Sequence, residues 1–187
     1  VLPNIQYRIA PKAEPRRLNV VVLDMQPIDP ACGGGRLRLL GLYHALGTHL
    51  TTTYVGTYDW PGPGHRDHQL TPTLREIDVP LSEQHFAASD DWRRLAGDKT
   101  GIGASFPMLA HLSPDYVQAV KTAARGADVV VCSHPWVYPL VADVLGRPGQ
   151  LLVYDGHNVE GVLRYRLLAD SEIGLRIVRH ATAVEYE

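Results

Sequence analysis

The sequence is poor in cysteine, in long apolar runs and in excess charge of either sign. Its two cysteines, Cys32 and Cys132, are far apart, and no disulfide is expected because secreted domains usually carry more cysteines. The longest apolar runs, such as residues 20–23 and 129–132, have the length of strands and are far too short to span a membrane. A net charge of −2 gives the surface as a whole no attraction for nucleic acid or for anionic lipid.

A targeting segment is also missing. Nothing ahead of Asn19 has the form of a signal peptide, so we expect a cytoplasmic protein with no nucleic-acid partner and no more than peripheral membrane association. The chain begins at Val1 instead of a methionine, which suggests a trimmed or partial chain. A length of 187 residues fits one domain with enough mass to bury a core.

Apolar runs of strand length recur along the chain. Residues 18–23, 127–132 and 151–154 are the clearest, and each ends at polar residues. Continuous apolar runs are typical of strands buried on both faces of a parallel sheet, so we expect all three to be inner strands. Residues 51–57 and 74–79 are weaker candidates for strands.

Helical patterns alternate with these runs. The expected helices begin after the glycines at 33–35, at Ser113 as a cap, at residue 139, and at Asp170 or Ser171 as a cap. The first keeps its apolar spacing as far as Leu50. Alternation of strand and helix predicts an α/β fold with a doubly wound, mostly parallel, Rossmann-like sheet.

Three segments do not follow this alternation. Residues 60–72 are interpreted as a loop, and residues 82–112 as an insertion of undefined structure. Residues 1–17, with three prolines and mostly basic charges, predict a loosely held N-terminal arm, in which residues 5–9 could add an edge strand. Residues 18–187 then make one Rossmann-like domain. Because no strand follows its last predicted helix, we expect this domain to be truncated.

The first candidate site is a glycine triplet. Ligands of open α/β sheets bind at the carboxyl ends of the strands, so the residues that follow the apolar runs matter most. Gly33, Gly34 and Gly35 open a helix after the first run, where backbone N–H groups and the helix dipole favour a phosphate, and Arg36 adds a positive charge. A flexible turn beside a solvated arginine explains the same residues. The G-x-G-x-x-G spacing of a dinucleotide site is absent.

Two further polar groups follow predicted strands. His134 comes directly after residues 127–132, where it could bond a ligand hydroxyl or move a proton, or only satisfy a loop carbonyl. After residues 151–154 come His157, Asn158 and Glu160 within a string that starts at an aspartate. Polar groups this dense at a strand end favour a binding site, whereas capping of the next helix is the alternative.

Metal and nucleophile chemistry find less support. His65 and His68 lie three residues apart but have no third ligand at a fixed spacing, so no metal site is predicted. Ser133, beside His134, lacks the G-x-S-x-G turn that exposes a nucleophile, and nucleophilic hydrolysis is not expected. No cofactor is predicted either.

Three strings, taken in order, resemble the N-terminal domain of retaining glycosyltransferase family 4, a group with the GT-B fold. They are GGGRLRLL at residues 33–40, ADVVVCSHP at 127–135 and VYDGHNVE at 153–160. The last string is the most similar to the family, and the resemblance covers residues 18–187.

The resemblance implies transfer of a sugar from a nucleotide-sugar donor to an acceptor, with retention of configuration. The glycine triplet, residues 33–35, matches the loop that approaches the donor diphosphate, with Arg36 beside it. His134 matches the histidine that contacts the donor sugar. His157 and Asn158 match a polar strand end that faces the cleft between domains, and Glu160 follows them as a further contact for acceptor or sugar.

Two parts of the family pattern have no match here. The donor-nucleotide contacts and the paired glutamates of the family lie in a second, C-terminal donor-binding domain of the parent chain. This fragment alone is therefore expected to be inactive. A non-catalytic Rossmann-like module that binds sugar or protein stays open as an alternative. A nucleotide-dependent oxidoreductase is disfavoured by the missing dinucleotide motif.

Overall fold

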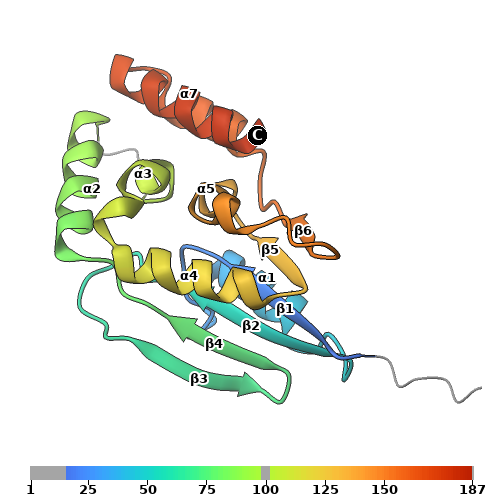
Figure 1. Ribbon diagram of the computed structural model, residues 1–187. Coiled ribbons are helices and arrows are strands. Elements are labelled where there is room, and N and C mark those ends of the chain that lie inside the picture. The colour runs from blue at the N-terminus through green and yellow to red at the C-terminus, as the bar shows by residue number, and fades with distance from the viewer. Residues whose placement is uncertain (1–15, 98–101, 187) are drawn as a thin grey trace, which may run out of the picture.

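A computed structural model describes residues 16–97 and 102–186, which form a six-stranded sheet with helices around it (Figure 1). Nearly all of the predicted N-terminal arm, with its proposed edge strand at 5–9, lies outside the described residues. The strands are β1 (Leu18–Leu23), β2 (Leu50–Gly56), β3 (Arg66–Thr71), β4 (Leu74–Asp78), β5 (Val129–Cys132) and β6 (Leu151–Tyr154). The α-helices are α1 (Gly33–Tyr43), α2 (Glu83–Leu95), α3 (Ile102–Leu109), α4 (Pro114–Gly126), α5 (Tyr138–Val141), α6 (Glu160–Leu168) and α7 (Glu172–Tyr186). Short 3-10 turns are η1 (Ala110–Leu112), η2 (Pro135–Val137) and η3 (Ala142–Val144).

The order of the strands confirms the predicted fold class. The sheet runs β3-β4-β2-β1-β5-β6, and every neighbouring pair is parallel except β3 with β4. The register places Leu23 of β1 beside both Val55 of β2 and Cys132 of β5. The chain is therefore a doubly wound, mostly parallel, Rossmann-like sheet whose strand ends meet along one edge.

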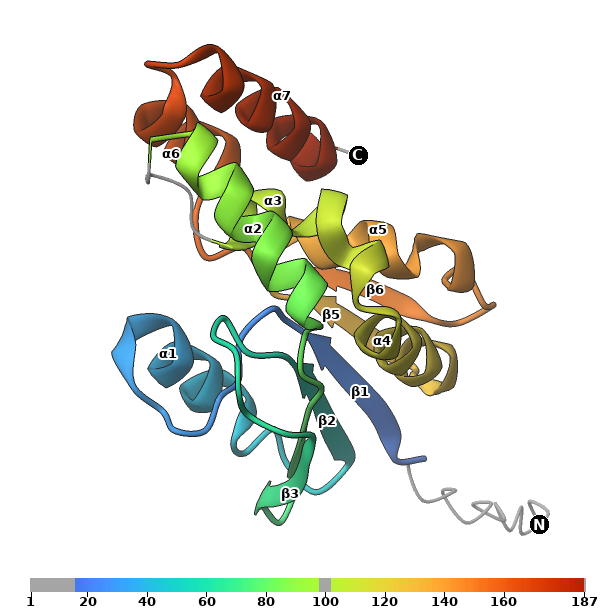
Figure 2. The ribbon, with the colours of Figure 1, turned by 90° about the vertical axis from the view of Figure 1, so that its left-hand side faces the viewer.

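Alternate residues of β1 supply two separate cores. Val20 and Val22 pack on one face with Leu39 of α1, whereas Val21 and Leu23 pack on the other face with residues of α4. Figure 2 shows α1 and α4 on opposite sides of the sheet. Because both faces of β1 are covered, the strand is apolar throughout its buried part, as the unbroken run predicted. Full burial of a leucine such as Leu39 contributes about 2 kcal/mol.

A third group of helices lies beyond the carboxyl ends of the strands. Helices α2, α3, α6 and α7 gather there (Figure 2). Leu168 of α6 packs with Ile177 and Val178 of α7 and with Ala96 after α2. Ser171 begins α7 as a cap, since its hydroxyl accepts a hydrogen bond of 3.1 Å from the N–H of Gly174. These helices therefore lie next to the carboxyl ends of the strands, where the candidate site residues are found.

One strand differs from its prediction. The run at 151–154 forms β6 but is an edge strand, not an inner one. Leu151 is 57% exposed and Leu152 is 45% exposed, so these apolar side chains are not buried in the core. Its backbone pairs only with β5, and its Tyr154 side chain is also exposed.

Other departures concern segments of weak pattern. The expected loop at 60–72 contains strand β3, and the expected insertion at 82–112 contains helices α2 and α3. The first helix ends at Tyr43, well before Leu50, which begins β2. Ser113 precedes α4 but makes no capping bond, because its hydroxyl is used by Ser82 and His85 instead. The helix expected at 139–145 is split into a short α-helix and a 3-10 turn.

Within the described ranges, no helix combines the length and the apolar character needed to cross a membrane.

Candidate functional site

Three adjacent parallel strands end together and place three side chains side by side. Asp24 follows β1, His134 comes two residues after β5, and His157 comes three residues after β6. Cys132 pairs with Leu23 on one side and with Tyr154 on the other, so the residues beyond them share one edge. Sequence reasoning proposed the two histidines but not the aspartate.

The aspartate and the first histidine form a hydrogen-bonded pair. His134 Nδ1 lies 2.9 Å from Asp24 Oδ1, and the Asp24 side chain is fully buried. Because a carboxylate only accepts, Nδ1 is the donor and Nε2 is left for other partners. Burial alone lowers the pKa of His134, but the hydrogen bond and charge of Asp24 outweigh it and raise that pKa.

The two histidines are in contact and have opposite pKa shifts. The ring centroids of His134 and His157 lie 4.7 Å apart. Burial, followed by the neighbouring His134, lowers the pKa of His157. Trp136 stacks on the other side of His134, with ring centroids 5.7 Å apart and an interplanar angle of 15°. The two imidazoles therefore differ in basicity, and His134 is the more basic of the two.

The glycine triplet begins α1 with its backbone N–H groups uncapped. Cys32, the residue before the helix, makes no side-chain capping bond, and the first turn carries no acidic residue. Gly33 has a φ of +78°, a conformation that L residues with side chains rarely adopt. Added Cβ atoms at Gly33 and Gly34 would meet nothing within 4 Å, so the surface in front of the helix is open. An open, uncapped helix start is suited to an anion.

Arg38 ties the glycine helix to the end of β6. Its guanidinium donates two hydrogen bonds to Asp155, at 3.2 and 2.5 Å, and Tyr43 donates a third, at 2.8 Å. Burial alone raises the pKa of Asp155, but the bonds from these two side chains hold it below its usual range. Asp155 therefore links the end of β6 to α1 and does not cap α6.

Arg36, in the same helix, has a mostly buried side chain that contacts Trp60 and Asp59. Its guanidinium sits 5.0 Å from the ring centroid of Trp60 and 3.4 Å from an oxygen of Asp59. The long ion pair is weak and half-exposed at Asp59, so the side chain has a partner that an anionic ligand could replace.

Glu160 and Asn158 bond to each other beside His157. Asn158 donates to Glu160 Oε1 at 3.1 Å, and Arg164 lies 3.2 Å from the other oxygen. Glu160 is only 1% exposed, so its carboxylate is committed to these two partners. Arg164 also stacks over Trp136, 4.7 Å from the ring centroid, which links this group to His134.

A buried network that the sequence did not indicate holds the loop between β1 and α1. Glu76 Oε1 accepts the backbone N–H groups of Ile28, at 2.5 Å, and of Asp29, at 3.2 Å. Arg66 reaches the same loop through Asp29 and bonds Asp78 at 2.7 Å. Burial, with the nearby Glu76 carboxylate, raises the pKa of Asp78 to about 7. This network fixes the path of the chain into the glycine triplet.

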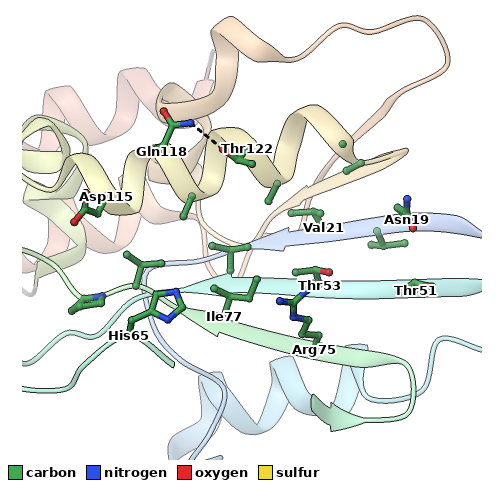
Figure 3. A pocket seen from close by; sticks show the side chains of 18 residues that line it. Asn19, Val21, Thr51, Thr53, His65, Arg75, Ile77, Asp115, Gln118 and Thr122 are labelled. Carbon is green, nitrogen blue, oxygen red and sulfur yellow. Dashed lines mark hydrogen bonds between the residues drawn. The ribbon is translucent and has the colours of Figure 1, made fainter. Parts of the chain in front are cut away.

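A separate groove of about 850 Å³ lies on the face of the sheet beside α4 (Figure 3). Val21, Thr53 and Ile77 line its floor, and Gln118 and Thr122 of α4 line its wall. None of the predicted site residues lines it. The sheet is open here because β2 is joined to β4 through a strand, β3, and not through a helix that would cover this face.

The structure therefore brings together some, but not all, of the site residues predicted from the sequence. His134 and His157 touch, and α1 reaches their strand ends through Arg38. Arg36 points to Asp59 and Trp60 instead. His65 and His68, which were not expected to form a metal site, lie beside and within β3, and His68 Nε2 is 3.5 Å from Glu76 Oε2 of the buried network. Of the described residues, Asp24, His134 and His157 form the one group close enough to hold a metal ion.

Comparison with known proteins gives limited likeness. No protein-family model matches the chain, and no curated protein does. Among solved structures, the chain is similar to a trehalose-6-phosphate protein from E. coli bound with UDP-2-fluoro glucose, at 16% identity and a TM-score of 0.41 over 73% of the chain. It is also similar to an alpha,alpha-trehalose-phosphate synthase (UDP-forming) from Burkholderia vietnamiensis, at 12% identity and a TM-score of 0.41 over 89% of the chain. The chain spans 32% and 36% of the lengths of these two structures.

Proposed function

We propose that this chain is the acceptor-side half of a glycosyltransferase that moves a sugar from a nucleotide-sugar donor to an acceptor, with retention of configuration. One observation carries the proposal: an uncapped glycine helix start and an imidazole oriented by a buried carboxylate are built on the same edge of a parallel sheet. The strings at 33–40 and 127–135, which resemble family 4, supply the glycines and the imidazole, whereas the carboxylate of Asp24 lies outside the three strings. Membership of that family, a cytoplasmic location and a C-terminal donor-binding domain in the parent chain belong to the same proposal.

The glycine triplet is assigned to the donor diphosphate. Cleavage of the sugar–phosphate bond builds negative charge on the leaving diphosphate, and fixed backbone dipoles stabilise that charge without reorganising. The N–H groups at Gly33, Gly34 and Gly35 have no competing acidic side chain in their turn. Arg36 adds a guanidinium that exchanges its weak contact with Asp59 for a phosphate oxygen.

His134 is assigned to the transferring sugar. With Nδ1 held by Asp24, its Nε2 is oriented toward a hydroxyl of the sugar and strengthens that bond as positive charge grows on the ring. Asp24 acts through His134 by fixing its tautomer and ring position. In a retaining reaction the leaving phosphate can take the acceptor proton, so no separate carboxylate base is required.

His157 and Asn158 are assigned to the acceptor or to the sugar. Asn158 is exposed while its amide donates to buried Glu160, so Glu160 serves to orient Asn158. The nucleotide base and ribose are left to the proposed second domain, whose closure would exclude water.

Sugar transfer by the full-length parent tests the proposal. His134→Ala should lower kcat by about one to three orders of magnitude, with a smaller change in KM for the donor, because the bond forms mainly in the transition state. His65→Ala is the matched control and should keep wild-type rates, because His65 is exposed and precedes β3, the strand on the opposite side of the sheet from β5 and β6. An unchanged kcat in His134→Ala contradicts the assignment.

The isolated chain gives a second test. Without a facing domain the diphosphate stays in water, where each charge-assisted bond contributes little, so donor affinity should be no better than roughly millimolar. Calorimetric titration with several nucleotide sugars measures it. A micromolar constant would place the donor site in this domain and contradict the division of roles.

A further inference from the structure

Trp136 contacts both the imidazole of His134 and the guanidinium of Arg164. Its ring centroid lies 5.7 Å from that of His134 with an interplanar angle of 15°, and the guanidinium carbon of Arg164 lies 4.7 Å from the Trp136 ring. Trp136 is fully buried, and a Cβ added at Gly103 of α3 would lie 2.8 Å from its ring. The indole therefore has little room to move, and its position restrains the imidazole that stacks on it.

Arg164 is itself held at its charged end. The carboxylate of Glu160, one turn earlier in α6, lies 3.2 Å from its guanidinium and is almost fully buried. The start of α6 is fixed in turn, because the N–H groups of Glu160 and Gly161 donate to the Glu185 carboxylate of α7 at 2.7 and 2.6 Å. A guanidinium is planar and charged, so it can stack on an aromatic ring and pair with a carboxylate at the same time. A continuous series of contacts therefore joins α7 and α6 to His134.

The same residues place two opposite charges near the imidazole. Burial lowers the pKa of His134 and the bond to Asp24 raises it; among the smaller effects, the charge of Glu160 raises this pKa and that of Arg164 lowers it. The ring of His157 touches the imidazole from the end of β6. Because Glu160 and Arg164 form one ion pair, their effects on His134 oppose each other, and removal of one charge leaves the other uncompensated.

We propose that Trp136, Arg164 and Glu160 are positioning residues that hold the ring of His134 and act on sugar transfer only through it. This inference rests on the proposed function, in which Nε2 of His134 meets a hydroxyl of the sugar. Nδ1–H already donates to Asp24, so Nε2 accepts a hydrogen bond only while the ring is neutral. The groups that set the basicity of His134 therefore set the lower limit of the pH range in which it works.

Replacing Glu160 with glutamine tests the effect of charge. Glu160→Gln keeps the shape of the side chain but leaves Arg164 unpaired, and a guanidinium does not lose its proton in a protein. NMR titration of the histidine rings in this chain should find a lower pKa for His134 than in the wild type. Glu160→Gln combined with Arg164→Met removes both charges and should return that pKa toward the wild-type value. Arg166→Met, at an exposed arginine of the same helix, is the matched control and should leave it unchanged.

Replacing Arg164 with lysine tests the effect of packing. Arg164→Lys keeps a positive charge near Glu160 but has no planar group to stack on Trp136. The Nδ1–H proton of His134, protected by its bond to Asp24, should then exchange with water about tenfold faster than in the wild type, because the ring is less restrained. Arg166→Met should keep the wild-type exchange rate.

Sugar transfer by the full-length parent separates this inference from the proposed function. On the acid side of the pH profile, kcat of Glu160→Gln, relative to its own value at neutral pH, should be about threefold above that of the wild type, because more of His134 is neutral. A lowered pKa of His134 with an unmoved pH profile contradicts the proposed function and supports the contacts to His134.

An unchanged pKa of His134 in folded Glu160→Gln overturns the inference, whatever the activity. If circular dichroism finds Glu160→Gln unfolded, Arg164→Lys decides alone, and wild-type exchange of the Nδ1–H proton in that variant overturns the inference.

Discussion

Replacing His85 with phenylalanine should remove one defined part of the acid sensitivity of this fold. His85 is fully buried in α2 between the rings of Phe86 and Phe106, with its Nδ1 3.2 Å from the Ser113 hydroxyl. Burial lowers its pKa from 6.5 to about 4. A folded pKa below the unfolded value means that the unfolded chain binds the proton more tightly, so stability is complete above pH 6.5 and is lost as the pH falls toward 4.

The size of this loss follows from the two pKa values. Between pH 7.5 and pH 5, preferential protonation of the unfolded chain at His85 lowers the free energy of unfolding by about 2 kcal/mol, and by about 3 kcal/mol below pH 4. With a urea m-value of about 2 kcal/mol/M, the first figure is a shift of about 1 M in midpoint.

Urea unfolding at pH 7.5 and pH 5 measures the effect. His85→Phe keeps an aromatic ring in the same space. Between pH 7.5 and pH 5 its free energy of unfolding should fall by about 2 kcal/mol less than that of the wild type. Phe86→Leu weakens packing beside the same site but keeps the imidazole, so it should show the wild-type loss. Equal pH dependence in His85→Phe and the wild type would refute the reasoning.

Three further outcomes are expected from urea unfolding at pH 7.5. Gly56→Ala should cost about 1–3 kcal/mol, because its Cβ would lie 2.6 Å from the carbonyl oxygen of Gln26; no loss would contradict this contact. Gly41→Ala, in the last turn of α1 with open space around it, should instead stabilise by about 0.5–1 kcal/mol, and a destabilised variant would argue against that open space. Asp155→Asn should cost about 1 kcal/mol, since it removes the paired bonds from half-exposed Arg38; a cost below about 0.3 kcal/mol would mean that the pair is not formed in solution.

The fold could be predicted wherever residue type and burial coincide. The apolar runs at 18–23 and 127–132 identify β1 and β5 because both faces of these strands are covered. The run at 151–154 is equally apolar but forms an edge strand. Its position could not be predicted, because which strand is outermost depends on the order of the whole sheet. Strand β3 was missed because Arg66 and His68 replace apolar residues there, and their burial depends on carboxylates of the neighbouring strand.

The candidate site was predictable only in part for a related reason. His134 and His157 follow apolar runs and could be identified from position alone. Asp24 also follows such a run, but its meaning comes from His134, 110 residues away, which reaches it through the pairing of β1 with β5. A signal did exist: the first polar residue after each of several parallel strands belongs to one edge. The network of Glu76 and Asp78 had no such signal, since alternating acids in a strand usually face solvent.

The bond between Arg38 and Asp155 has a consequence for cooperativity. Arg38 lies three residues after the last glycine of the triplet, and Asp155 lies two residues before His157, so one ion pair joins the two halves of the edge. A ligand that orders the start of α1 also restrains the loop that carries His157. Free-energy coupling is reciprocal, so occupancy of the histidine end must favour the glycine end by the same factor. Through this pair, binding at the glycine end and binding at the histidine end are coupled, and each raises the affinity of the other.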